Sequence, residues 1–207
     1  SAELELGDYE SAKADFDKAI SMDPKNYDRL IEIYEALADY GYREVGQEYL
    51  QNVLNTAKQL DAYDSGRIYY YLGDYQKAYL ALEEAKGKGG VDSYLYLGKA
   101  YAATGDYNYA SSVYSNYLSK QGPDAEIYNQ LGLCEMAKKD YQKALEAFQA
   151  GKQIEGNSLM QTLSFNEIVA YEYLQDYQKA AVLLKAYLQN YPDDQAAIRE
   201  QQFLSTR

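Results

Sequence analysis

The chain has 207 residues, of which 47% are hydrophobic, and its formal net charge is −12 at pH 7. This composition is ordinary for a folded protein and excludes wholesale disorder. The negative charge makes nucleic acid a poor partner because the phosphate backbone would repel it. No apolar run approaches the roughly 20 residues that a membrane-spanning helix needs.

The N-terminal segment reads as the tail of a helix, residues 1–6, followed by a second helix after Gly7. Residues 1–40 hold 11 acidic and 4 basic side chains, a net of −7, so this end is the acidic end. We expect a solvated cap here; the alternative is a docking surface for a basic partner. An incomplete first repeat predicts that more protein precedes it or that it pairs with a second copy of the chain. Because the chain opens at Ser1 without an initiator Met, the localisation stays open between exported, membrane-anchored and cytoplasmic.

A short cassette recurs along the chain: Gly-Asp-Tyr, with alanine three residues after the tyrosine. It begins at residues 7, 73 and 105, recurs with a changed first residue at Lys139 and Gln175, and is degraded at Gly41. The six starts are spaced by 34, 32, 32, 34 and 36 residues. A regular period of this size predicts a solenoid in which each repeat is one supersecondary unit.

Residues 91–124 show how one repeat is built. One face of a first helix is marked by residues at helical spacing, Tyr94, Leu97, Gly98 and Tyr101. Gly105 is expected to end that helix in a left-handed turn, and Asp106 to cap the second helix. The second helix carries its own stripe, Ala110, Tyr114, Tyr117 and Leu118. Each repeat is therefore predicted to be an antiparallel helix hairpin.

Small residues recur at two sites of the repeat. The second helix carries one five residues after the turn: Ala12, Gly46, Ala78, Ala110, Ala144 and Ala180. The first helix carries another: Gly66, Gly98 and Gly132. Since glycine inside a helix costs about 1 kcal/mol relative to alanine, its recurrence predicts a close helix crossing. Tyr34 and Ile168 break the second pattern, so looser packing is expected in the second and sixth repeats.

Aligned on the cassette, the chain resembles the tetratricopeptide repeat, which has two helices in 34 residues. The resemblance implies an all-α fold, a right-handed superhelical solenoid of antiparallel helix hairpins over residues 1–207. The implied boundaries are a partial repeat at 1–24, full repeats at about 25–58, 59–90, 91–124, 125–160 and 161–192, and a capping helix at 193–207. Two departures, at Gly41 and in the glycine-rich turn 86–90, affect local geometry only.

The resemblance also implies that the first helices line a concave groove. The residues at the groove positions of this family are Tyr63, Arg67, Tyr70, Tyr71, Leu95, Lys99, Asn129, Leu133, Met136, Phe165, Val169 and Tyr173. This set is rich in aromatic and apolar groups, and Tyr and Arg are frequent in binding hot spots. The two interpretations are a partner-binding surface and rings that neighbouring helices bury.

The leading hypothesis is a non-enzymatic scaffold that binds a peptide segment of a partner protein in the groove, with Arg67 and Lys99 selecting acidic groups. The basic and amide set that grips a C-terminal carboxylate in chaperone-binding relatives is missing, since Ile31, Glu35, Leu95 and Leu133 stand at such positions. One alternative is glycan or small-ligand binding by the tyrosine-rich groove, with Tyr63, Tyr70 and Asn129 as candidates. The other is self-assembly as a homodimer through the N-terminal repeat.

Residues for catalysis or metal binding are scarce. The chain has no histidine and a single cysteine, Cys134. This removes the commonest general base and the commonest nitrogen ligand for metals, and it excludes an intramolecular disulfide. Cys134 lies among apolar residues and is interpreted as a packed core residue. We therefore expect no catalytic residue, metal site or cofactor.

Overall fold

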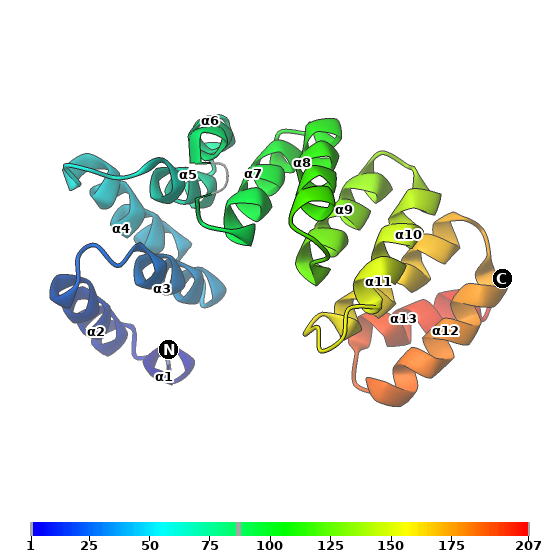
Figure 1. The fold of residues 1–207 in the computed structure, drawn as a ribbon. Helices are drawn as coiled ribbons and strands as arrows, with labels where there is room; N and C mark the ends of the chain where they lie inside the picture. The colour runs from blue at the N-terminus through cyan, green and yellow to red at the C-terminus, as the bar shows by residue number, and fades with distance from the viewer. Residues whose placement is uncertain (1, 86–87, 207) are drawn as a thin grey trace. The chain divides into compact units, whose positions relative to one another are not determined.

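The computed structural model describes residues 2–85 and 88–206, and throughout these ranges the ordered elements are α-helices, numbered α1 to α13 (Figure 1). This confirms the all-α prediction. The helices group into two compact units, residues 1–89 and 90–207, which we call the N-terminal unit and the C-terminal unit. Each unit is described by itself.

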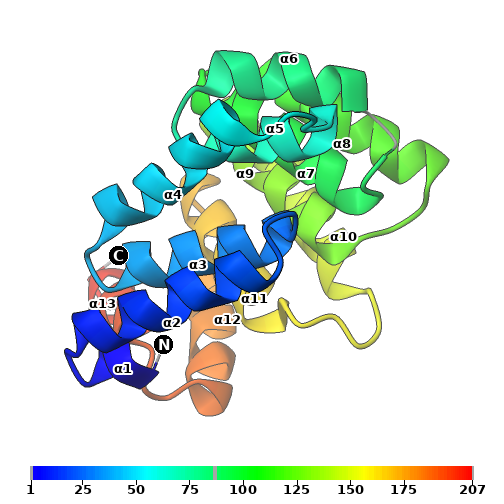
Figure 2. The ribbon, with the colours of Figure 1, turned by 90° about the vertical axis from the view of Figure 1, so that its left-hand side faces the viewer.

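The N-terminal unit is built from three successive helix pairs. Its helices are α1 (Ala2–Glu5), α2 (Tyr9–Met22), α3 (Tyr27–Asp39), α4 (Arg43–Thr56), α5 (Ala62–Tyr71) and α6 (Tyr75–Ala85). Contacts join α1 to α2, α3 to α4 and α5 to α6, and successive pairs meet through α2 with α3 and through α4 with α5. Figure 2 shows α2 lying beside α3.

The C-terminal unit continues the same pattern with three hairpins and a last single helix. Its helices are α7 (Val91–Ala103), α8 (Tyr107–Lys120), α9 (Ala125–Ala137), α10 (Tyr141–Lys152), α11 (Met160–Tyr173), α12 (Tyr177–Asn190) and α13 (Gln195–Leu204). Each helix contacts the next along the chain from α7 on, and α7 also contacts α9. We use the term first helices for the helix that opens each hairpin and for α13, which follows the last hairpin where a further one would open. These helices are α3, α5, α7, α9, α11 and α13. No described helix has the length and hydropathy to cross a bilayer.

The turn inside each hairpin forms as predicted. Gly105 has a φ of +84°, and the Asp106 side chain accepts a hydrogen bond of 3.3 Å from the backbone N–H of Tyr109 at the start of α8. The same turn is made by Lys139 with a φ of +64° and by Gln175 with a φ of +63°. An L-residue in this left-handed region costs roughly 1–2 kcal/mol, so these two turns are strained where Gly105 is not.

The predicted close crossing of the two helices is confirmed. A Cβ atom added at Gly66, Gly98 or Gly132 would come closer than 3.0 Å to a large side chain of the second helix. Those side chains are Leu82, Tyr114 and Phe148, and all three are fully buried. The large side chain of the second helix therefore fills the space that a Cβ atom on the first helix would occupy.

The looser packing expected in the second repeat is wrong. Tyr34 on α3 is 5% exposed, and its ring occupies the space of the Cβ that Gly46 on α4 lacks. The small and large partners are exchanged between the two helices, so the crossing stays filled. In the sixth repeat Ile168 is also buried, in one cluster with Ala180 and Leu184. The pattern break at Tyr34 is compensated by the residue across the hairpin, Gly46.

The final helix forms as predicted after Pro192. Asp194 accepts hydrogen bonds from the backbone N–H groups of Ala196 and Ala197, and it also accepts one of 2.6 Å from the Tyr187 hydroxyl. Ala197 and Leu204 are buried against α12. In the glycine-rich turn 86–90, residues 86 and 87 lie outside the described residues.

Candidate functional site

Four of the predicted groove residues lie on α5 of the N-terminal unit, where Arg67 is the central one. Arg67 is only 7% exposed. Its Nη1 lies 2.5 Å from Asp28 Oδ1 and its Nη2 lies 2.5 Å from Asp64 Oδ1, while its guanidinium covers the ring of Tyr63 at 4.3 Å. The guanidinium is thus engaged within the unit. The selection of acidic partner groups expected of Arg67 would require these ion pairs to break.

Tyr70 and Tyr71 take part in a packed cluster of tyrosines. The Tyr71 ring lies 5.1 Å from that of Tyr34 and 5.5 Å from that of Tyr70, with interplanar angles of 58° and 80°. The Tyr71 hydroxyl donates a hydrogen bond to Glu35 on α3. A cavity of about 430 Å³ borders this cluster, lined by Tyr34, Glu35, Ala38, Asp39, Arg43, Tyr70, Tyr71 and Tyr75. Tilted, half-buried rings do not make the flat stacking platform that glycan binding needs.

In the C-terminal unit, the polar residues predicted for the groove join neighbouring first helices. The Lys99 ammonium on α7 lies 3.5 Å from a carboxylate oxygen of Glu126 on α9. The Asn166 amide on α11 donates a hydrogen bond of 2.9 Å to the Asn129 amide oxygen on α9. Asn129 is buried, so it holds helices together and is not presented to a sugar. These contacts place α7, α9 and α11 in one layer.

The apolar groove residues of this layer are unevenly exposed. Leu95, Met136, Phe165 and Val169 are half-buried. Leu133 on α9 is 42% exposed and Tyr173 on α11 is 56% exposed. Tyr173 keeps a fixed ring orientation because it stacks on Tyr141 at 4.8 Å. Of the twelve predicted residues, these two present the most side chain to solvent, and both lie in the C-terminal unit.

Val169 and Tyr173 open onto a cavity of about 550 Å³ among α11, α12 and α13. We call it the C-terminal cage, and its lining residues are Val169, Glu172, Tyr173, Tyr177, Glu200 and Phe203. Two of these lining residues, Glu200 and Phe203, lie on α13, and neither was predicted from the sequence. The spacing from the capping aspartate could have predicted Phe203. Asp194 caps α13 as Asp124 caps α9, and Phe203 lies nine residues after Asp194, just as Leu133 lies nine residues after Asp124.

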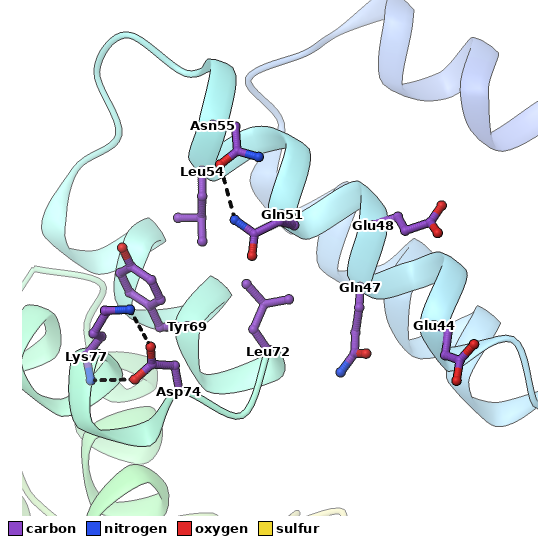
Figure 3. Close-up of a pocket in the computed structure, with 10 residues that line it drawn as sticks. All are labelled: Glu44, Gln47, Glu48, Gln51, Leu54, Asn55, Tyr69, Leu72, Asp74 and Lys77. Carbon is purple, nitrogen blue, oxygen red and sulfur yellow. Dashed lines mark hydrogen bonds and ion pairs between the residues drawn. The ribbon is translucent and has the colours of Figure 1, made fainter.

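A different cavity of about 630 Å³ lies between α4 and the α5–α6 hairpin (Figure 3). Its lining is mostly polar: Glu44, Gln47, Glu48, Gln51, Leu54, Asn55, Tyr69, Leu72, Asp74 and Lys77. Figure 3 shows Lys77 beside Asp74 and Gln51 beside Asn55. The Lys77–Asp74 ion pair has a length of 2.6 Å, and the Gln51 amide donates a hydrogen bond to the Asn55 amide oxygen. The cavity contains no predicted groove residue, and these two polar pairs join residues three and four positions apart in the chain. We interpret it as a solvated space between successive hairpins.

The described residues offer little for catalysis. Cys134 is 4% exposed, and burial raises the pKa of its thiol to about 11, which disfavours the nucleophilic thiolate. This confirms Cys134 as a core residue. Among the described residues, no three Cys, Asp or Glu side chains gather closely enough to hold a metal ion.

Comparison with known proteins is informative about the fold. Sequence models of the tetratricopeptide repeat match residues 1–26, 95–158 and 165–194. Curated protein sequences give no match. Among solved structures, YrrB, described as a TPR protein with an unusual peptide-binding site, is 20% identical over 90% of this chain and 97% of its own, with a TM-score of 0.60.

Two further structures are similar over most of their length. A thermophilic TPR protein from Thermus thermophilus is 15% identical over 87% of this chain and 100% of its own, with a TM-score of 0.66. MamA from Desulfovibrio magneticus is 18% identical over 82% of this chain and 98% of its own, with a TM-score of 0.58. At these identities the likeness concerns the arrangement of helices.

Proposed function

Because the chain belongs to the tetratricopeptide repeat family, we propose that it is a non-enzymatic scaffold that binds a peptide segment of a partner protein along its first helices. Of the twelve predicted residues, the proposed binding surface takes those on α7, α9 and α11 of the C-terminal unit, because Arg67 on α5 is already held by ion pairs within its own unit. The repeat boundaries given above are part of the proposal. Protein binding is the general role of this family. The peptide-binding site attributed to YrrB supports the same mode here by analogy of fold alone.

The observation that carries the proposal is the exposed apolar surface of the first helices in the C-terminal unit. Leu133, Tyr173 and Phe203 are 42%, 56% and 39% exposed, and they come from α9, α11 and α13. Large exposed apolar groups favour association, because covering them removes apolar area from water at about 25 cal/mol per Å². A tyrosine held by stacking loses little conformational freedom when it binds.

The polar residues between these groups support the same assignment. Lys99 with Glu126 and Asn129 with Asn166 are already paired, so they fix the spacing of neighbouring first helices. A surface whose frame is held by internal contacts is pre-organised, and a partner does not have to order it. We infer that contact energy comes from the apolar residues and that the paired polar residues set the geometry.

Affinity capture with matched variants tests the proposal. The groove variant carries Leu133→Ala and Tyr173→Ala. The control carries Leu80→Ala and Tyr109→Ala, which removes one leucine and one tyrosine of 62% and 61% exposure from second helices. We expect a partner retained by the wild type and by the control to be lost by the groove variant. Loss with the control and retention with the groove variant would move the site to the second helices.

A second candidate function is self-assembly through the N-terminal repeat. The observation that favours it is the exposure of two apolar side chains: Leu6, in the turn after α1, is 85% exposed, and Met22, at the end of α2, is 75% exposed. Light scattering over a concentration series, repeated with Leu6→Ser and Met22→Ser, tests it. A mass that stays that of one chain at every concentration would exclude a homodimer.

A further inference from the structure

The C-terminal cage combines apolar and aromatic walls with two carboxyl groups, which an apolar contact alone does not require. Val169, Tyr173, Tyr177 and Phe203 form its walls, and two carboxyl groups, Glu172 from α11 and Glu200 from α13, share the same space. No lysine or arginine is among its lining residues in the part of the chain that the structure describes. Two acids are thus placed together with no cation supplied by the cage itself.

The two carboxyls pair with each other and not with a donor from elsewhere among the described residues. Glu172 Oε1 is buried, and no N–H or hydroxyl group of the described residues donates to it. Burial, and then the hydrogen bond and charge of Glu200, raise the pKa of Glu172 to about 8. A buried acceptor without a donor is costly, and two facing carboxyls relieve the cost by sharing a proton. A cationic donor from outside would satisfy both carboxylates at once.

The aromatic walls favour the same occupant. Tyr177 and Phe203 meet edge to face, with ring centroids 6.5 Å apart and an interplanar angle of 76°. Tyr173 stands at the rim, 56% exposed and stacked on Tyr141. The face of an aromatic ring attracts a cation, and the attraction grows when the site is partly desolvated. Rings and carboxylates around one opening therefore select a positive group with an apolar stem.

We propose that the C-terminal cage binds a lysine or arginine side chain of the partner peptide, with its cationic head between Glu172 and Glu200 and its stem against Tyr173 and Phe203. This inference rests on the proposed peptide-binding function and adds a specificity to it. A guanidinium suits the pair best, because its planar set of donors can reach two carboxylates together. The other first-helix contacts remain apolar.

A consequence is that binding displaces the shared proton. The titratable groups that face Glu172 are Glu200 on α13 and Tyr177 on α12, with Tyr173 on its own helix. Below about pH 8 the pair holds a proton that the cation must expel, whereas above it both acids are charged. Arginine keeps its charge throughout this range. Affinity for an arginine peptide should therefore rise as the pH is raised from 6 to 9.

The test is selection from a random 12-residue peptide display library on the full chain. Three proteins are compared: wild type, the double variant Glu172→Gln with Glu200→Gln, and a control, Glu146→Gln with Glu155→Gln. The control removes the same two charges from exposed sites of the C-terminal unit. We expect arginine or lysine to be enriched at one fixed position on the wild type and on the control, and no such enrichment on the Glu172 and Glu200 variant.

A peptide selected in this way is then titrated calorimetrically. We expect the double variant to weaken its binding at least tenfold and to abolish the rise in affinity between pH 6 and 9, while the control does neither. Tyr173→Leu, which leaves both acids in place, should weaken binding by a smaller factor. Circular dichroism checks that every variant keeps its helicity.

Two failures are distinguishable. Peptides selected without any preference for a basic residue, or bound equally well by the double variant, would overturn the cage and leave the scaffold function standing. Selection of no peptide at all on the wild type would overturn the proposed function, and the cage would fall with it.

Discussion

The same position of the repeat is used in opposite ways on α5 of the N-terminal unit and on α9 of the C-terminal unit. Arg67 on α5 and Leu133 on α9 each stand six residues before the left-handed turn residue of their hairpin. Arg67 is buried between Asp28 and Asp64, whereas Leu133 is 42% exposed. The position in the repeat determines which face a side chain occupies. Residues on neighbouring helices determine whether it holds the unit together or stays available to a partner.

The largest expected effect comes from what the two units share, the close crossing inside the hairpin. Gly66→Leu and Gly98→Leu should each destabilise their own unit by about 3 kcal/mol, because the new side chain collides with Leu82 or Tyr114. Lys99→Leu, one residue from Gly98 and half-exposed, should change stability by less than about 1 kcal/mol. Urea denaturation measures all three. Equal midpoints would show that the crossing does not limit packing.

The next prediction places leucine at residue 67 and arginine at residue 133, so that each position receives the residue type of the other. Arg67→Leu should cost about 2 kcal/mol, because it leaves Asp64, whose pKa burial already raises, without its cation. Leu133→Arg should cost less than about 0.5 kcal/mol, since an exposed site accepts a charged side chain. The same denaturation experiment compares them. A larger loss from Leu133→Arg would reverse the contrast drawn between α5 and α9.

A smaller effect concerns the turns. Lys139→Gly should stabilise the C-terminal unit by up to about 1 kcal/mol by relieving a positive φ, and Gly105→Ala should destabilise it by a similar amount. Thermal unfolding followed by circular dichroism measures both. Lys139→Gly with an unchanged or lower Tm would mean that the turn carries no strain.

The last prediction is a pH dependence of the C-terminal unit, which comes from Glu172. The pKa of Glu172 is about 8 in the folded chain, above the ordinary value of 4.5. A raised folded pKa means that the contribution of Glu172 to stability is complete below pH 4.5 and is lost as the pH rises through 8. Glu172→Gln keeps a neutral group, so its stability relative to wild type should increase from pH 4.5 to pH 9. A constant difference across that range would show that Glu172 ionises normally.

The sequence predicted what local patterns determine. The hairpins, the left-handed turns, the aspartate caps and the crossing at Gly98 follow from residues within a single repeat. The exchange of small and large residues between Tyr34 and Gly46 was not predicted, because each residue was compared with the residues at the same position of other repeats and not with its partner across the hairpin. Considering the two positions of one hairpin together predicts a filled crossing.

The sequence predicted the state of the groove residues less well, because their neighbours lie one repeat away. Arg67 is paired with Asp28, 39 residues earlier, and Asn129 is joined to Asn166, 37 residues later. No spacing within one repeat contains this information. Phe203 was missed for a related reason: α13 was treated as a cap, although its residues continue the layer of first helices.

The central claim is that the first helices of the C-terminal unit carry the partner-binding surface. Amide hydrogen exchange of the full chain, with and without a selected peptide, tests it most directly. We predict added protection in α9, α11 and α13 and none in α3 and α5, where the groove positions are already used for internal ion pairs. Protection concentrated in α3 and α5, with α11 and α13 unchanged, would contradict the account.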